Sequence, residues 1–310
     1  MLNDRLASAG VTFLERGWLS ANNVIIRGDG RNAVVDTGYA SHAEQTAALV
    51  RQALGAEPLH AIINTHLHSD HCGGNAALQD AYPLVETHIP PGQADAVRNW
   101  DPHALSYTPT GQVCPRFKIQ GLLSPGESVQ LGSHAWEVHA AKGHDPHAVV
   151  LFEPKSGILI SGDALWENGF GVVFPELEGI EAFHEVGETL DVIEQLAPSI
   201  IIPGHGQVFD DLALALKRAR SRLEQFLRAP EKHHRYAIKV LIKYRLLEWQ
   251  QIPFDELLTW AEATPYLQNS MPGGLENSGS DKRSAWLQEI LDELETSGAL
   301  TLGDGMVTNR

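Results

Sequence analysis

The chain has 310 residues, of which 43% are hydrophobic and 20% charged, and its formal net charge is −16; this is the composition of a globular protein long enough for a large core and a second domain. No run reaches the roughly 18 apolar residues of a membrane-spanning helix, and two cysteines are too few for a disulfide framework. Because Met1–Arg5 is not a basic region followed by an apolar stretch, we expect a cytoplasmic protein.

The first part of the chain alternates between predicted strands and helices. Apolar residues over 11–26 and 32–36 predict two early strands. Residues 41–54 predict a helix, since their apolar side chains recur on one helical face. Residues 57–88 then predict a strand, a polar loop, a helix and another strand.

The polar loop over residues 64–74 carries the strongest functional signal, and it reads Asn-Thr-His-Leu-His-Ser-Asp-His-Cys-Gly-Gly. It follows the apolar run 61–63, and its two glycines permit a tight turn toward a helix. A fold rarely crowds imidazoles and a carboxylate into one turn unless something binds them. Four candidate metal ligands lie within six residues: His66, His68, Asp70 and His71.

The middle of the chain begins with an irregular stretch. Residues 89–126 are rich in proline, glycine and polar residues, which predicts a lid over the site. Anchoring to the protein surface is the alternative role of its larger side chains. Residues 126–163 predict a second set of strands, 166–175 a loop and 183–196 a helix. The side chains that are candidates for covering the site are Trp100, His103, Tyr107 and Phe117.

Three more candidate ligands follow strand-like runs in this middle part. His144 follows the run 135–140, Asp163 follows 157–162, and His205 comes after a run of isoleucines. Side chains at strand ends are well placed for chemistry because the strands fix their loops. Seven such ligands predict two cations in one site.

The C-terminal part predicts a separate small domain that begins near Pro230. A glycine-rich loop is expected over residues 273–279. The predicted helices cover 236–249, 254–263 and 283–296, and a hairpin is expected over 299–308.

A basic segment joins the two parts. Residues 217–245 hold ten Lys and Arg against Glu224 and Glu231, a local charge of +8 within an acidic chain. One interpretation is a patch that faces an anion, such as a nucleic acid or a coenzyme phosphate. The other is a helix face that balances an acidic neighbouring domain.

The motif His-x-His-x-Asp-His, followed by a single His, an Asp and a last His, resembles the metallo-β-lactamase fold superfamily over about residues 10–210. The resemblance implies an α/β protein with the four-layer αββα fold over residues 1–229. Residues 230–310 are similar to the winged-helix-like module of some lactamase-like endoribonucleases. Their third helix is acidic, which disfavours reading of a DNA sequence. The resemblance also implies one metal on His66, His68 and His144, a second on Asp70, His71 and His205, and a bridge through Asp163.

The resemblance narrows the chemistry as well. A bridging carboxylate at Asp163 is similar to glyoxalase II and to general hydrolases of the superfamily, whereas its true β-lactamases lack one there. Histidine at position 68 favours zinc, with iron and manganese as alternatives, and single-iron persulfide dioxygenases share most of the motif. Asp70 and Asp163 are the catalytic candidates, because they would orient the metals and accept a proton from a metal-bridging hydroxide.

Three functions follow as hypotheses. The first is a dinuclear metal-dependent hydrolase of a small thioester or ester. The second is a phosphodiesterase or endoribonuclease that acts on single-stranded RNA, which makes nucleic acid a less favoured partner. The third is a non-enzymatic scaffold or regulator. A second copy of the chain is a further candidate partner, and no membrane partner is expected.

Overall fold

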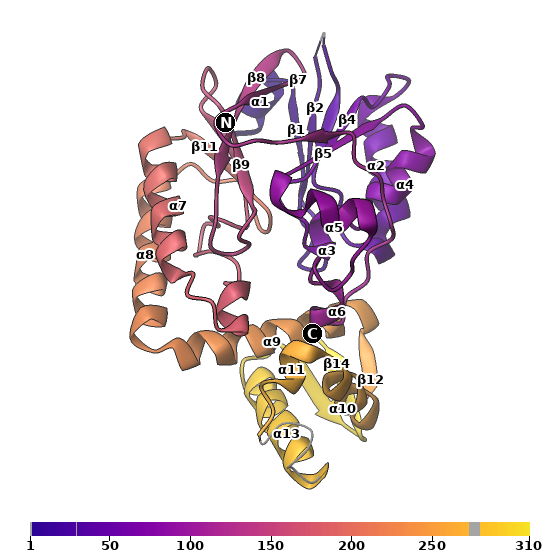
Figure 1. The fold of residues 1–310 in the computed structure, drawn as a ribbon, viewed down its shortest axis with the longest axis vertical. Coiled ribbons are helices and arrows are strands. Elements are labelled where there is room, and N and C mark those ends of the chain that lie inside the picture. Colours follow the sequence, from indigo (N-terminus) through magenta and orange to yellow (C-terminus); the bar gives the residue numbers. More distant parts are fainter. Residues whose placement is uncertain (1, 29, 273–279) are drawn as a thin grey trace.

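Two β-sheets stacked face to face form the centre of the larger part of the molecule (Figure 1). The computed structural model describes residues 2–28, 30–272 and 280–310, so the loop predicted over 273–279 lies outside the described residues. The first sheet has the order β1-β2-β3-β4-β5-β6. Its strands are β1 (Val11–Leu14), β2 (Asn23–Ile26), β3 (Ala33–Val35), β4 (Ala61–Ile63), β5 (Glu86–Ile89) and β6 (Gly121–Leu122).

The second sheet has the order β11-β10-β9-β8-β7. Neighbouring strands run antiparallel except β10 and β11, which are parallel, as are β3 to β6 in the first sheet. Parallel neighbours end at the same edge of a sheet, so the loops after β10 and β11 can meet. The strands are β7 (Ser128–Leu131), β8 (His134–Ala140), β9 (Val149–Glu153), β10 (Ile158–Gly162) and β11 (Ile200–Pro203).

Alternation of side chains along the strands divides the core into three layers. In β2, Val24 and Ile26 face the second sheet, whereas Ile25 faces helices on the outside. In β10, Ile158 and Ile160 face the first sheet, whereas Leu159 faces outward. Each sheet is therefore buried on both faces, which confirms the predicted four-layer αββα arrangement.

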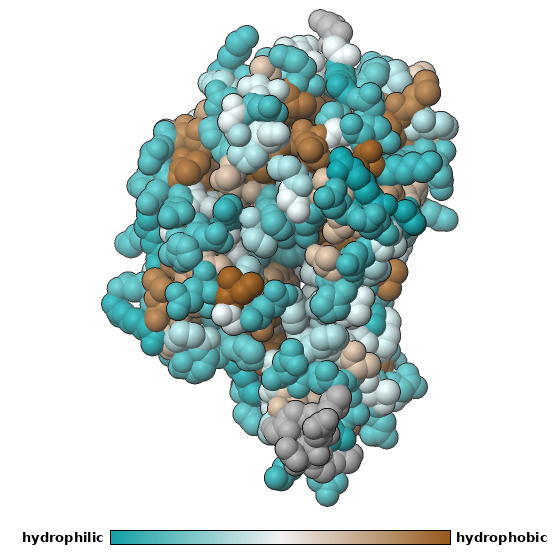
Figure 2. All heavy atoms as spheres, in the orientation of Figure 1, coloured by the Kyte–Doolittle hydropathy of each residue, from teal (hydrophilic) through white to brown (hydrophobic). Residues whose placement is uncertain are grey.

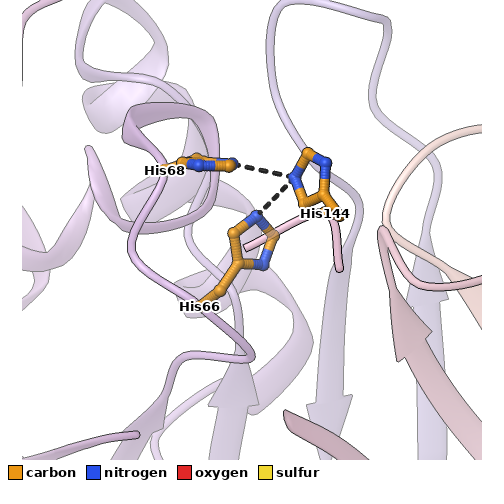
Figure 3. A group of neighbouring side chains, drawn as sticks. All are labelled: His66, His68 and His144. Carbon is orange, nitrogen blue, oxygen red and sulfur yellow. Dashed lines mark hydrogen bonds between the residues drawn. The ribbon is translucent and has the colours of Figure 1, made fainter. Parts of the chain in front are cut away.

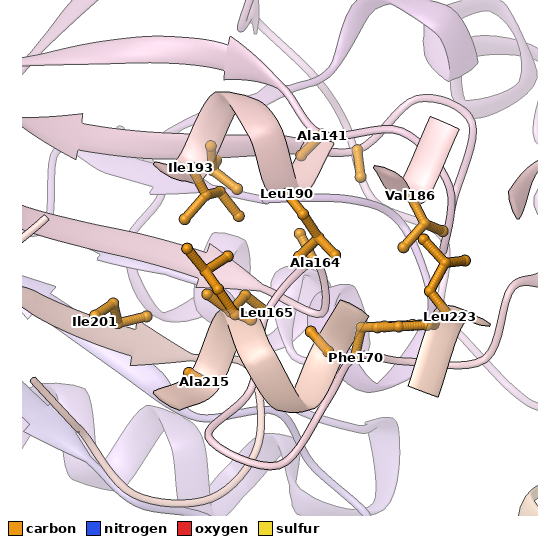
Figure 4. Close-up of a cluster of buried hydrophobic side chains, with 14 of the residues drawn as sticks. Ala141, Ala164, Leu165, Phe170, Val186, Leu190, Ile193, Ile201, Ala215 and Leu223 are labelled. Carbon is orange, nitrogen blue, oxygen red and sulfur yellow. The ribbon is translucent and has the colours of Figure 1, made fainter. Parts of the chain in front are cut away.

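Helices cover both outer faces. α2 (Ala43–Leu54) and α4 (Asn75–Ala81) pack on the first sheet. α7 (Phe183–Leu196) and α8 (Leu212–Arg228) pack on the second, and their apolar side chains meet those of the strands (Figure 4). The other helices of this part are α1 (Leu2–Ser8), α3 (Ser69–Cys72), α5 (Ala94–Asn99), α6 (Tyr107–Thr110) and the 3-10 helices η1 (Ala40–His42), η2 (Pro91–Gln93) and η3 (Phe174–Glu178).

Two predicted segments differ from the structure. The strand expected over residues 11–26 is interrupted between β1 and β2, because Arg16 turns inward and its guanidinium donates to the Thr46 hydroxyl at 2.8 Å. The stretch 89–126 is less irregular than expected, since it contains α5, α6 and β6. Short helices closed by turns carry little periodicity, so the sequence pattern did not reveal them.

The C-terminal region has its own apolar core at one end of the sandwich (Figure 1). α8 ends at Arg228 and α9 begins at Pro230, so a helix break falls at the predicted boundary; the division into two domains stays a prediction. α9 begins six residues earlier than expected, since proline suits the first turn of a helix. The elements are α9 (Pro230–Trp249), β12 (Gln251–Pro253), α10 (Phe254–Ala263), α11 (Pro265–Gln268), α13 (Ser280–Thr296), β13 (Leu300–Gly303) and β14 (Met306–Asn309), with the sheet order β12-β14-β13.

The surface in Figure 2 is mostly hydrophilic, with small scattered apolar areas. Within residues 2–28, 30–272 and 280–310, no helix combines the length and the apolar character that crossing a lipid bilayer demands.

A buried histidine joins α9 to the sandwich and should make stability depend on pH. The Nε2 atom of His233 accepts a hydrogen bond from the Val173 backbone N–H at 3.0 Å. Burial, and then the neighbouring His234 and Arg222, lowers the pKa of His233 to about 4. The unfolded chain, with a histidine pKa of about 6.5, therefore binds a proton before the folded chain does. His233 contributes stability above pH 6.5 that is lost as the pH falls toward 4.

We expect this loss to be roughly 2 kcal/mol between pH 7 and pH 5. Urea unfolding at both pH values should show that His233→Gln, which does not titrate, loses less stability on acidification than the unmodified chain. The exposed His103→Gln is the matched control. Identical losses for all three proteins would show that His233 does not titrate as described.

Candidate metal centre

The seven predicted ligands meet at one edge of the two sheets, although they come from separate parts of the chain. Four follow β4, and α3 holds two of them. His144 lies on the loop between β8 and β9, Asp163 directly follows β10, and His205 is the second residue after β11. The structure thus brings the predicted residues together, and their roles as ligands stay a prediction.

The first group consists of three buried histidines whose rings converge (Figure 3). The Nε2 atom of His144 lies 2.8 Å from Nδ1 of His68 and 3.3 Å from Nε2 of His66. Burial lowers the pKa of each imidazole, that of His68 to about 4. Neutral rings at neutral pH have lone pairs to offer, so the group suits a metal with nitrogen ligands.

The second group consists of Asp70, His71 and His205, whose candidate ligand atoms lie within 4.8 Å of one another. His205 Nε2 is 3.1 Å from Asp70 Oδ2. Asp163 lies between the two groups: its Oδ2 is 3.5 Å from His144 Nε2 and 3.8 Å from His205 Nε2. Its Oδ1 is 3.4 Å from His71 Nε2. One carboxylate therefore reaches both groups.

The charges of this edge suit bound cations. Burial raises the pKa of Asp163, but the neighbouring His205 and His71 outweigh burial and hold it well below its usual range. Burial lowers the pKa of His71, but Asp36, Asp163 and Asp70 outweigh it and raise the pKa well above the usual value. The carboxylates of Asp36, Asp163 and Asp70 thus favour a positive charge at this position, and the proton on His71 supplies it.

His71 also offers an unused ligand atom. Among the described residues, its buried Nε2 atom has no hydrogen-bond partner. Buried carboxylates are stable only when paired or when they bind metal ions. The donor set, its burial and this orphaned nitrogen all fit divalent cations.

A second layer of contacts orients the candidate ligands. Asp36 Oδ2 lies 2.7 Å from His71 Nδ1, and the same carboxylate accepts from the backbone N–H and the hydroxyl of Thr65, at 2.9 and 2.8 Å. The His144 ring directs Nδ1 at the carbonyl oxygen of Val172, 2.5 Å away. Such contacts fix which ring nitrogen faces a metal.

Asp36 is not among the site residues that the sequence predicted. A signal existed, because Asp36 directly follows β3 as the predicted ligands follow their strands. The residue is alone there, without a neighbouring histidine, and its backbone adopts the left-handed region with φ of 54°. Asp is among the residues that tolerate this conformation.

We expect Asp36→Asn to lower metal affinity by about 10- to 100-fold, the usual effect of losing an outer contact to a ligand. The amide lacks the charge that holds His71 in place, while it keeps the size of the carboxylate. Competition with a chromophoric chelator measures the affinity. Glu153→Gln is the matched control, because Glu153 is also a buried carboxylate but accepts from Ser156 instead. Equal affinities of both variants would contradict this role of Asp36.

A cleft opens above the candidate metal centre, and α9 forms one wall of it. Tyr236, Val240 and Tyr244 recur at intervals of four along this helix and face the cleft. The Tyr244 hydroxyl donates to the carbonyl of Leu19 at 3.0 Å, which ties the helix to the sandwich. The sequence pattern predicted a helix over residues 236–249, but it carried no sign that this helix lies at the site.

Two tryptophans also line the cleft. Trp18 is 57% exposed and stacks on His205, with ring centroids 5.3 Å apart. The Trp166 indole N–H donates to Asp163 Oδ1 at 3.2 Å. An exposed aromatic side chain at this position offers an apolar contact to a bound molecule.

The segment 89–126 contributes less to the cleft than expected. Thr110 and Gln112 line it. His103 is exposed, and the three aromatic candidates instead pack in a common cluster, which is the anchoring role: Trp100, Tyr107 and Phe117.

The chain is similar in sequence to known proteins. The sequence model described as "Metallo-beta-lactamase superfamily" matches residues 16–205. A hydroxyacylglutathione hydrolase of Synechococcus sp. (strain JA-2-3B'a(2-13)) is 29% identical over 188 residues, which cover 59% of this chain and 62% of that protein. The chain thus spans less than two thirds of this relative.

Two solved structures share the fold. A metallo-beta-lactamase family protein from Thermus thermophilus has a TM-score of 0.56 at 19% identity, over 97% of this chain and 99% of that chain. Its likeness therefore extends over the C-terminal region. The protein TTHA1623, solved in a di-iron-bound form, has a TM-score of 0.51 at 24% identity, over 67% of this chain and 98% of that chain.

Proposed function

Since the chain belongs to the metallo-beta-lactamase superfamily, we propose that it is a metal-dependent hydrolase that acts on a small thioester or ester at a two-metal centre. The observation that carries the proposal is the position of Asp163, whose two oxygens reach both groups of histidines. A shared carboxylate is typical of centres with two cations.

The proposed ligand sets follow from these distances. His66, His68 and His144 would hold one cation, while Asp70, His71 and His205 would hold the other, with Asp163 shared. Two cations would supply Lewis acidity and lower the pKa of a water molecule held by them. The nitrogen-rich set favours zinc, and iron remains an alternative because imidazole also suits it.

The chain's own residues would perform the remaining tasks. Asp70 and Asp163 are held ionised by neighbouring histidines, so each can accept a proton from the attacking water. The Trp166 indole fixes the orientation of Asp163. Phe174 and Leu241 line the cleft and exclude bulk water from the reacting atoms.

The apolar walls of the cleft favour a small acyl compound over RNA. The hydroxyacylglutathione hydrolases that resemble the chain support a thioester as substrate. Binding of RNA relies on cations that contact phosphates, whereas most basic residues of the 217–245 segment are paired with carboxylates of the same chain.

A substrate panel tests the proposal. The metal-loaded chain is assayed with S-lactoylglutathione, an acyl-coenzyme A, a lactone and single-stranded RNA. We expect turnover of at least one thioester or ester, which chelation abolishes and added metal restores. Cleavage of RNA alone, or thioester turnover that is unaffected by metal removal, would contradict the proposal.

A further inference from the structure

The basic segment 217–245 is largely neutralised by carboxylates within the fold. Lys243 donates to the backbone carbonyls of Ala299 and Arg310. Six of the ten basic residues form ion pairs, so most of the segment's charge is used in contacts within the chain. The pairs are Arg218–Glu167, Arg220–Asp191, Arg220–Glu194, Arg228–Glu224, Arg235–Glu289, Arg235–Glu293, Lys239–Glu293 and Arg245–Glu248.

Arg222 is different, because its guanidinium is partly buried and lies against aromatic rings. Its central carbon is 4.4 Å from the ring centroid of Tyr236, 5.4 Å from that of Phe226 and 5.6 Å from that of Phe170. Among the described residues, no carboxylate forms an ion pair with it. The pKa of the nearby His233 is lowered to about 4, so this imidazole is neutral at pH 7 and does not form an ion pair with the guanidinium.

Arg222 also lies beside elements that line the cleft. Tyr236, against which it stacks, lines the cleft. On the other side, a Cβ atom at Gly169 would lie only 2.9 Å from Nη1 of Arg222, so the guanidinium touches the loop after β10. Trp166 and Gly171 of this loop line the cleft as well. The cation is thus held between α8, α9 and the loop that carries Asp163.

We propose that Arg222 binds an anionic group, a carboxylate or a phosphate, on the leaving group of the substrate. This inference rests on the proposed thioester or ester hydrolysis and names the chemistry of the part that leaves. A guanidinium stacked on aromatic faces keeps its N–H edge available for a planar or tetrahedral anion. In a chain of net charge −16, an unpaired cation next to the cleft walls selects for an anion locally.

Two arginines on the same helix provide a matched comparison. Arg222→Gln removes the proposed contact, whereas Arg220→Gln removes a cation that is already paired with Asp191 and Glu194. Arg222→Lys keeps the charge without the planar fork. Each is assayed as the metal-loaded full chain with three thioesters: S-lactoylglutathione with carboxylates, an acyl-coenzyme A with phosphates, and the neutral thioester of N-acetylcysteamine.

We expect Arg222→Gln to raise KM at least about tenfold for one anionic thioester with kcat little changed, which indicates lost ground-state binding. The KM of the neutral thioester should not change. Arg222→Lys should restore part of the affinity, and Arg220→Gln should behave like the unmodified chain. The anionic substrate that is affected identifies carboxylate or phosphate as the group bound.

Equal losses for neutral and anionic substrates would overturn the inference and leave Arg222 as a packing residue. If no thioester or ester is turned over, the proposed function fails, and calorimetry with coenzyme A and glutathione then tests the inference by itself. Weaker binding of one of these anions to Arg222→Gln than to Arg220→Gln would support it. A loss confined to single-stranded RNA would overturn it.

Discussion

Asp163→Ala should lose nearly all hydrolytic activity together with at least one metal ion per chain. The carboxylate lies between two groups of histidines, 3.4–3.8 Å from ring nitrogens of His71, His144 and His205. Removing it leaves each cation one ligand short and the histidines facing one another. We expect an activity loss well beyond the roughly 10- to 100-fold that follows loss of an outer contact.

Elemental analysis and kcat/KM measured on the same preparation decide the matter. The unmodified chain should hold close to two metal ions. Glu167→Ala is the control, since this exposed carboxylate lies four residues away on the same loop and pairs with Arg218. If Asp163→Ala kept both metals and full turnover, Asp163 would not be the shared ligand.

A chain that ends at Ala229 should keep its metal ions but lose its activity or change its substrate range. The seven candidate ligands all precede this point. The truncation removes the helix wall of the cleft, which includes Tyr236, Val240 and Tyr244. Substrates would then be poorly positioned, and even a displacement of about 1 Å can cost roughly a hundredfold in rate.

A full-length variant separates this effect from poor folding of the shortened chain. Val240 is partly exposed and faces the cleft, so Val240→Trp should fill the space for substrate while both metals stay bound. Lys232→Trp, at an exposed position of the same helix, is the control. Unchanged kcat/KM in both the truncated chain and Val240→Trp would show that α9 has no part in catalysis.

The sequence pointed to the side chains that meet at this edge because their signal is local. His66, His68 and His71 lie within one turn, and His144 and His205 each end an apolar run beside glycine. Strand-like patterns placed all of them at strand ends. Burial on both faces of each sheet then followed from the continuous apolar runs, as in β10 and β11.

The remaining features depend on contacts between distant segments. Asp36 acquires its role only because β3 and β4 are neighbours, which brings it to His71, 35 residues later. The row of Tyr236, Val240 and Tyr244 on α9 predicts a covered helix face, but it does not show which surface lies opposite. The interruption between β1 and β2 depends on the burial of Arg16 by partners that include Thr46. A local sequence pattern does not show which distant residues will become these contact partners.

The shared edge of the two sheets also has a consequence for how the chain folds. The candidate ligands extend from His66 to His205, and the helix above them comes later still. Contacts between such distant segments close large loops, which makes folding slow relative to proteins with local contacts. A cation that arrives early finds only the ligands of residues 66–71 in place. Metal binding should therefore belong to the last stage of folding. We expect bound metal to slow unfolding of the finished structure and to leave the folding rate little changed.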